Sequence, residues 1–353
     1  MTPLEGFIRE LIASEGPLRL DRYMALCLGH PQHGYYMSRD PLGAGGDFIT
    51  APEVSQVFGE LIGVWCATAW KMMGEPHSFN LVELGPGRGT LMADILRAGR
   101  VVPGFRHAAK VGLVEISPAL RAIQTQTLGE AAWYGTLEDV PQGPAIIVAN
   151  EFFDAIPIRQ FEKRDGKWLE RVVFADDGGL QLGLADAPDL IGQQSHGVDG
   201  NVIEWAEFRS EIAAGIGRRL AAEQGYTLII DYGHLQTSHG DTLQAMRQHQ
   251  HVPVTDQPGE SDLTSHVDFE ALAKAIVAGG GKVAGAGMQG DFLRAMGIDQ
   301  RFAQLAAKVD ADTQARLGRA KSRLADHGQM GNLFKVLAAH APGLSTPYPF
   351  GRP

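Results

Sequence analysis

The chain has 353 residues, of which 44% are hydrophobic and 20% are charged, and it carries a formal net charge of −10 at pH 7. This composition is that of a globular protein, and the length predicts a core domain with insertions or a second lobe. The negative charge argues against nucleic-acid binding. No apolar run is long enough to cross a bilayer, so we expect no membrane insertion.

The cysteine content and the N-terminus predict the compartment. Two cysteines, Cys27 and Cys66, give no disulfide framework and indicate a reducing environment. The first residues resemble neither a signal peptide nor an arginine-rich transit sequence, so we expect a cytoplasmic protein. Residues 2–28 are predicted to be helical, with a break at Pro17.

The next segment, from His30 to Asp47, is rich in glycine, proline and tyrosine and is predicted to be a loop. An amphipathic helix should follow, beginning at Thr50 or Pro52. A polar, glycine-rich loop of this kind is either a plain connector or a lid over a ligand. We therefore take Asp47, Phe48 and Thr50 as candidates for lid or substrate contacts.

The most informative stretch runs from Leu81 to Thr90 and reads LVELGPGRGT. A strand, a glycine turn and a helix start form a nucleotide cradle, because glycines allow close approach and the helix presents unpaired N–H groups. The pattern G-x-G-x-G differs from the G-x-G-x-x-G of pyrophosphate sites, and an acidic residue precedes it. A carboxylate there suits a cationic ligand with an amino-acid tail. We therefore predict S-adenosylmethionine (SAM) as cofactor, with contacts from Glu83, Gly85, Pro86, Gly87 and Thr90.

Glu115 stands near the end of the next predicted strand, Lys110 to Ile116. A nucleotide-binding α/β fold places there the carboxylate that accepts the two ribose hydroxyls. We assign Glu115 and Ile116 to the cofactor site. After a helix that starts at Pro118 and a short strand over 131–134, the loop around Leu137 is a candidate for the adenine side.

The apolar run from Ala145 to Ala149 is predicted to be a central parallel strand. It places Asn150, Glu151 and Asp154 beyond the carboxyl edge of the sheet, where open α/β sheets bind ligands. These polar residues are therefore candidates for the catalytic, acceptor-binding end of the site.

The second half of the chain predicts an insertion and then the rest of the sheet. Alternating patterns at 159–161, 167–174 and 180–184 indicate hairpins. A helix over 208–224 and a strand over 226–231 follow. The polar stretch 234–262 has little hydrophobic periodicity and is predicted to be a functional loop. The last expected elements are helices at 267–277 and from 291, and strands at 282–286 and 333–338.

These elements predict an α/β protein with a mostly parallel sheet and helices on both faces. We expect an N-terminal helical and lid region at 1–75 and a core formed by 76–158 and 225–340. An inserted, substrate-facing lobe should occupy 159–224, and a tail 341–353.

The chain resembles the MidA-like SAM-dependent methyltransferases, the family of the mitochondrial complex I assembly methyltransferase. The resemblance rests on GDFITAPE at 46–53, VELGPGRGTL at 82–91, VEISP at 114–118, NEFFDAIP at 150–157, DYG at 231–233 and DLTSHVDF at 262–269. It implies a class I, Rossmann-like methyltransferase fold and, from the mitochondrial member, methylation of an arginine in a complex I subunit. His266 lies in the last string, before a predicted helix, and is assigned to substrate contact or capping.

Two other interpretations are less well supported. Several histidines lie between His234 and His266, but no cysteine is near them and the carboxylates lack ligand spacing, so we predict no metal. The string NEFF at 150–153 is similar to the NPPF string of nucleic-acid amino methyltransferases. The glutamate in place of proline, together with the acidic charge, argues against that activity.

We expect a SAM-dependent N-methyltransferase that acts on an arginine in a protein. The reason is that two carboxylates, Glu151 and Asp154, match the donor fork of a guanidinium. Two alternatives stay open: a small-molecule methyltransferase and a non-catalytic assembly factor that binds SAM. The sequence fixes neither the substrate nor the oligomeric state, and a homodimer is one arrangement.

Overall fold

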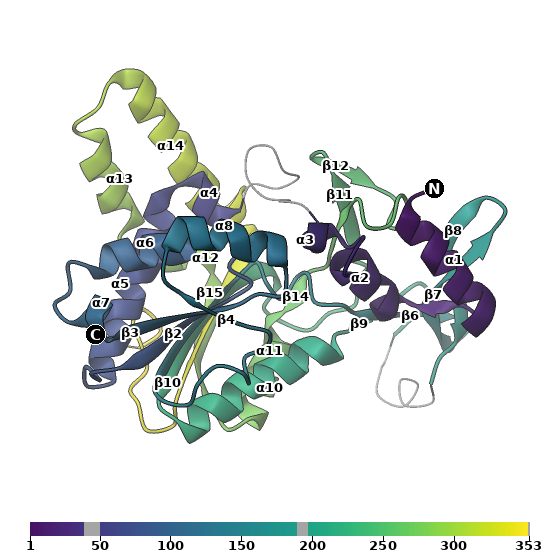
Figure 1. The fold of residues 1–353 in the computed structure, drawn as a ribbon, viewed down its shortest axis with the longest axis horizontal. Coiled ribbons are helices and arrows are strands. Elements are labelled where there is room, and N and C mark those ends of the chain that lie inside the picture. Colours follow the sequence, from purple (N-terminus) through teal and green to yellow (C-terminus); the bar gives the residue numbers. More distant parts are fainter. Residues whose placement is uncertain (39–49, 189–196, 352–353) are drawn as a thin grey trace.

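A computed structural model describes residues 1–38, 50–188 and 197–351 (Figure 1). Its centre is a mostly parallel sheet with strand order β15-β16-β10-β5-β2-β3-β4, in which β16 runs antiparallel to both neighbours and β14 lies beside β10. Its strands are β2 (Phe79–Leu84), β3 (Ala109–Val114), β4 (Ala132–Tyr134), β5 (Ala145–Asn150), β10 (Gly225–His234), β14 (Val267–Asp268), β15 (Lys282–Met288) and β16 (Phe334–His340).

The helices that come next in the chain after the neighbouring strands β2 and β5 lie on opposite faces of the sheet. After β2, α6 (Thr90–Gly99) packs with α5 (Gln56–Met72) on one face, whereas α10 (Glu207–Ala222) and α11 (Phe269–Ala278) cover the other. Alternate residues of β5 enter the two cores, as the strand period of two requires. Because the strand order reverses between β2 and β5, their carboxyl ends border the crevice where such sheets bind ligands.

The remaining helices surround this core. They are α4 (Ala51–Val54), α7 (Phe105–Ala108), α8 (Pro118–Leu128), α12 (Gln289–Ala295), α13 (Ile298–Ala306), α14 (Ala311–Ala325) and α15 (Met330–Leu333). The last three were not predicted, and α13 and α14 form a hairpin that projects from the body (Figure 1). The clearest local signal for α14 is Asp310, which caps it by accepting the Thr313 N–H at 2.8 Å. In the described ranges, no helix combines the length and apolar character needed to cross a membrane.

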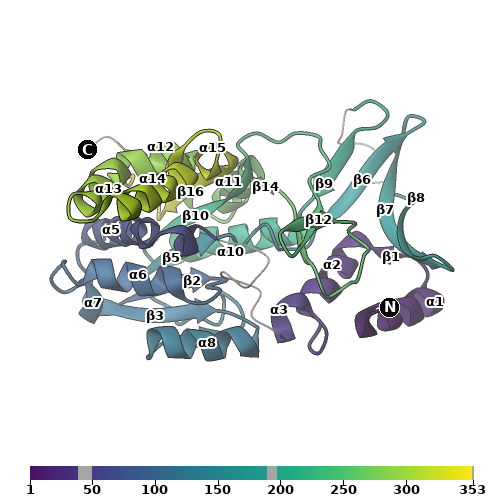
Figure 2. The same cartoon turned by 90° about the horizontal axis from the view of Figure 1, so that it is seen from above.

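The N-terminal helices belong to a separate body beside the sheet (Figure 2). There α1 (Pro3–Glu15), α2 (Leu20–Gly29) and α3 (Tyr35–Ser38) accompany an antiparallel sheet of inserted strands, and buried residues of α1 and α2 share one apolar cluster with that sheet. We call residues 1–38, 158–188, 197–206 and 235–264 the second lobe. Its larger sheet comprises β1 (Leu18–Arg19), β6 (Arg159–Arg164), β7 (Lys167–Asp176), β8 (Gly179–Asp186) and β9 (Val202–Trp205).

The stretch 234–262, predicted to be a loop, contains regular structure. It contains β11 (Gln244–Arg247) and β12 (Gln250–Val252), and β11 also pairs with β13 (Asp262–Thr264). The two-residue turn of this hairpin, Gln248 and His249, has positive φ angles of 51° and 61°. Such turns favour Asn-Gly or Asp-Gly, so this turn carried no recognisable signal.

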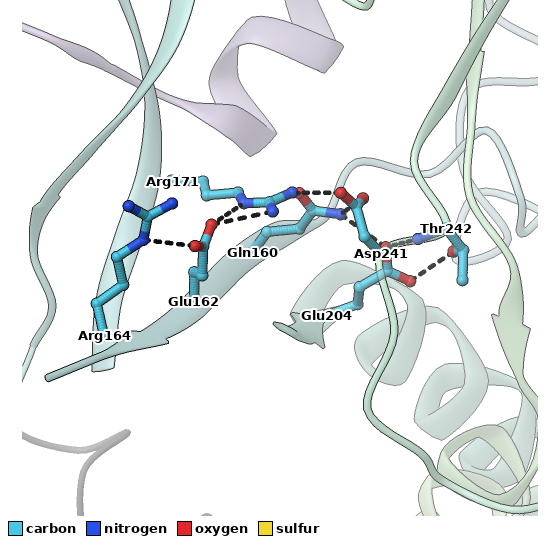
Figure 3. A network of polar contacts seen from close by, with 7 residues as sticks. All are labelled: Gln160, Glu162, Arg164, Arg171, Glu204, Asp241 and Thr242. Atoms are coloured by element: carbon cyan, nitrogen blue, oxygen red, sulfur yellow. Dashed lines mark hydrogen bonds and ion pairs between the residues drawn. The ribbon is translucent and has the colours of Figure 1, made fainter. Parts of the chain in front are cut away.

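A chain of polar contacts fastens the loop after β10 to the larger sheet of the second lobe (Figure 3). The buried Gln160 donates to Glu204 Oε1 at 2.8 Å and to Asp241 Oδ1 at 2.9 Å. Arg171 holds Asp241 from the other side at 2.6 Å, and Thr242 donates its hydroxyl to Glu204 at 2.6 Å. These contacts fix the position of the loop relative to the strands.

Candidate active site

A cavity of about 350 Å³ lies at the carboxyl ends of β2 and β5 and is also bordered by the second lobe. Most of the predicted site residues meet there. The lining includes Thr50, Glu83, Gly85, Pro86, Gly87, Thr90, Glu115, Ile116, Asn150 and Glu151. Asp47 and Phe48 lie outside the described residues.

The glycine turn gives the cavity a wall of bare backbone. Gly85, Gly87 and Gly89 have positive φ angles of 62°, 53° and 80°, which side chains disfavour. A Cβ on Gly85 would lie 2.7 Å from the ring of Phe152, so this turn also needs glycine in order to pack against the segment after β5. Thr90 begins α6 at the end of the turn, and the first two residues of this helix, Thr90 and Leu91, line the cavity.

Glu83 provides a buried acid beneath the turn. It is 2% exposed, on the α5/α6 side of the sheet near Cys66 and Met92, and burial raises its pKa to about 8. Its Oε2 atom has no hydrogen-bond partner among the described residues. A buried carboxylate that borders a cavity is costly unless a donor or cation reaches it. The ammonium group of SAM is such a cation, so the site fits this cofactor.

Glu115 is fixed in place at the end of β3. Its Oε1 accepts the Ser117 N–H at 2.8 Å, and its Oε2 accepts Gln124 Nε2–H at 3.2 Å. A carboxylate accepts about four hydrogen bonds, so Glu115 can take further donors such as hydroxyls. Gln124, which sequence reasoning missed, is fully buried and also donates to the Gly87 carbonyl at 2.7 Å. It therefore ties the glycine turn to Glu115.

The short helix α4 spans the cavity between its two ends. The Ala51 N–H donates to Glu151 Oε1 at 3.0 Å, and Glu53 Oε1 accepts the Thr90 hydroxyl at 2.6 Å. Glu53 lines the cavity but was not selected as a site residue from the sequence. Its position in the string at 46–53 was the available signal. The helix α4 therefore connects the cofactor side of the cavity, at Thr90, with the side at Glu151.

Glu151 occupies an unusual backbone conformation at the mouth of β5. Its φ of 52° lies in the left-handed region, which costs a non-glycine residue about 1–3 kcal/mol. Besides Ala51, the Asn150 side chain donates to Glu151 Oε1, at 3.0 Å. Burial raises the pKa of Glu151 to about 7. Both donors bind Oε1, and no donor from the described residues binds Oε2.

The other predicted residues lie away from the cavity lining. Asp154 is buried beside Tyr232, and burial raises its pKa. Leu137 is 6% exposed and packs in the core under α10 and α11. His266 lines a further cavity of about 240 Å³, with its ring edge-on to Tyr232 at a centroid distance of 5.7 Å, and burial lowers its pKa. His234 also lines that cavity, but the described part of the chain shows no cluster arranged to hold a metal ion.

Tyr36 joins the second lobe to the core at the cavity. Its hydroxyl donates to Asp262 Oδ1 at 2.7 Å, and its carbonyl accepts the Ser117 hydroxyl at 2.5 Å. Together with Ala25 and Leu28 of α2, it lines the cavity. A ligand that fills the cavity therefore contacts both parts of the molecule.

Comparison with known proteins agrees with this geometry. Residues 61–287 match the family described as "Putative S-adenosyl-L-methionine-dependent methyltransferase". The chain is 38% identical to the Drosophila melanogaster protein named protein arginine methyltransferase NDUFAF7 homolog, mitochondrial, over 94% of this chain and 83% of that protein. It is 35% identical to the human protein arginine methyltransferase NDUFAF7, over 96% and 83%.

A solved structure extends the comparison to the fold. A protein from Burkholderia thailandensis, crystallised with S-adenosyl-homocysteine, matches with a TM-score of 0.84 and 28% identity, over 96% of this chain and 91% of that chain. The predicted fold, family and cofactor are confirmed. The chain belongs to this family of SAM-dependent methyltransferases.

Proposed function

We propose that this chain methylates an arginine side chain in a protein substrate. The observation that carries the proposal is the placement of Glu151, which lines the cavity and whose Oε1 is held by the Ala51 N–H and the Asn150 amide, whereas no donor from the described residues binds Oε2. A guanidinium is a planar cation whose N–H groups match carboxylate oxygens. Glu151 would bind it in one orientation and direct one nitrogen toward the cofactor side.

The chemistry needs little beyond orientation and one proton acceptor. SAM supplies an electrophilic methyl group on sulfur. As the N–C bond forms and the S–C bond breaks, the acceptor nitrogen must lose a proton. Glu151, whose burial raises its pKa to about 7, can hold the guanidinium as a carboxylate and then accept that proton.

The charge of the second lobe supports a basic substrate. Its described residues include 16 aspartates and glutamates but 9 lysines and arginines. Four of these acids, Asp21, Glu162, Glu170 and Asp262, are buried, and the remaining excess of negative charge attracts positively charged segments, such as those around many modified arginines. The names of the animal relatives support arginine as the acceptor. The resemblance to the complex I assembly methyltransferase makes a respiratory complex I subunit a candidate substrate.

The test compares wild type with Glu151→Gln, which keeps the shape of the side chain but removes its charge. Each protein is incubated with isotope-labelled SAM and an extract of cells that lack the gene, and labelled amino acids are identified after hydrolysis. We expect labelled methylarginine with wild type and a loss of about 100-fold or more with Glu151→Gln, at nearly unchanged SAM affinity. The exposed Glu130→Gln is the matched control and should behave like wild type.

The result also separates the alternatives. Label confined to small molecules would favour a small-molecule methyltransferase. A protein that binds SAM but transfers nothing from wild type would favour a non-catalytic assembly factor. Full activity of Glu151→Gln would contradict the proposed role of this carboxylate.

A further inference from the structure

The segment Glu151–Ile156, here called the acceptor loop, is held on its amide side by one buried carboxylate. Asp231 Oδ2 accepts three successive backbone N–H groups, those of Phe152, Phe153 and Asp154, at 3.2, 3.0 and 3.2 Å. Asp231 is fully buried in the second half of β10. Three amides that converge on one oxygen fix the path of the chain immediately after Glu151.

The same loop is held on its carbonyl side by one buried guanidinium. Arg209 Nη2 donates to the Asp154 carbonyl at 2.9 Å, and Nε and Nη2 both donate to the Ile156 carbonyl at 3.2 Å. Its other bonds go to the Ser265 hydroxyl at 2.6 Å and the His266 carbonyl at 2.8 Å. Arg209 is 3% exposed and comes from α10, on the far side of the inserted lobe in the sequence.

Neither charged group lines the cavity at β2 and β5. Each acts on the loop backbone, because the Asp231 carboxyl group accepts from its N–H groups and the Arg209 guanidinium donates to its carbonyls. Charged hydrogen bonds are stronger than neutral ones, and buried charges are tolerated only when they are fully partnered. A connecting loop has no need of this arrangement, since water or neutral side chains can satisfy its backbone.

We propose that Asp231 and Arg209 are positioning residues that hold the acceptor loop so that Glu151 keeps its left-handed conformation and its orientation at the cavity. This inference rests on the proposed role of Glu151. The strain at φ 52° supplies the reason for a clamp, because a strained residue persists only where its surroundings over-determine it. If the clamp loosens, Glu151 relaxes and its carboxylate turns away from the position in which it orients the acceptor.

The test uses Asp231→Asn and Arg209→Lys in the full chain. In Asp231→Asn the side-chain amide cannot accept all four backbone N–H groups that the carboxylate accepts, including that of Tyr232 at 2.9 Å. Arg209→Lys keeps the charge but loses the planar fork, and it carries the test if Asp231→Asn does not fold. The controls are Arg219→Lys and Asp268→Asn. Arg219 lies on the same helix as Arg209 and donates to carbonyls at and near Val140, and Asp268 caps α11.

Three quantities are measured for each protein: hydrogen exchange of the peptide spanning 150–156, SAM affinity by calorimetry, and the initial rate of methyl transfer to extract protein at saturating SAM. We expect faster exchange in that peptide and a rate about 10- to 100-fold lower in both test variants, with SAM affinity within about twofold of wild type. The controls should change neither the exchange of this peptide nor the rate.

Unchanged exchange at 150–156, an unchanged rate, or an equal loss in the control variants would each overturn the inference. Because exchange reports the clamp without reference to activity, its result stands apart from the proposed function. Full activity of Glu151→Gln would refute the proposed role of Glu151, whereas full activity of Arg209→Lys beside an inactive Glu151→Gln would refute only the clamp.

Discussion

Replacing Glu115 by alanine should weaken SAM binding by about 1.5–3 kcal/mol, which is about 10- to 150-fold in Kd. The carboxylate lines the cavity, and its two oxygens are held by the Ser117 N–H and the Gln124 side chain, so it cannot turn away from a ligand. Two hydroxyls of a ribose would add charged hydrogen bonds. In the variant, water can replace part of this interaction, which keeps the loss within the stated range.

Glu115→Gln is the sharper companion variant. Its amide nitrogen must face either the Ser117 N–H or the Gln124 amide, so a donor meets a donor on one side. We therefore expect a loss similar to that of alanine although the shape is kept. Calorimetric titration with SAM measures the affinity, thermal unfolding without ligand reports the cost to the fold, and the exposed Glu130→Ala is the control. Unchanged SAM affinity in a folded Glu115→Ala protein, with only turnover reduced, would place the ribose elsewhere.

Three further predictions concern the same cavity. Gly87→Val should abolish SAM binding, because a branched side chain is strained at φ 53° and fills ligand space. The control is Gly129→Val, at φ 72° with open space around it, which should retain SAM binding in calorimetric titration. The free energy of unfolding of the ligand-free protein should fall as pH rises from 5 to 8, because the pKa of Glu83 is near 4.5 in the unfolded chain but about 8 in the folded one. Denaturant titrations of Glu83→Gln should show a smaller dependence of this free energy on pH, and a dependence equal to that of wild type would refute the prediction. Methyl transfer at saturating SAM should rise as pH passes through about 7 and Glu151 ionises, and a pH–rate profile flat from 6 to 8 would contradict that role.

The central parts of the site could be predicted because their signals are local in the sequence. The glycine turn, Glu115 and the residues after β5 each follow directly from a strand, and parallel strands deliver their carboxyl ends to one edge. The same logic could not place Leu137, which packs in the core, or His266, which lines a different cavity. Both stand after turns or short strands whose direction no local pattern reveals.

The residues that sequence reasoning missed act through distant contacts. Arg209 reaches carbonyls more than 50 positions earlier in the chain. Asp231 stands in the string DYG at 231–233, but nothing in that string points to the amides it accepts almost 80 positions earlier. The contact between Ala51 and Glu151 joins positions 100 apart. A side chain that binds backbone leaves no residue pattern at its target, because every residue offers the same N–H and C=O groups. Such clamps become visible only when the fold brings the segments together.

The central claim, arginine methylation directed by Glu151, is tested most directly by mass spectrometry of whole proteomes. Cells that carry the gene, cells that lack it and cells that carry only Glu151→Gln are compared for methylated peptides. We predict at least one protein whose methylarginine is present with wild type and absent from the other two. Identical methylarginine in all three, or a methylated lysine or small molecule as the only difference, would contradict the account.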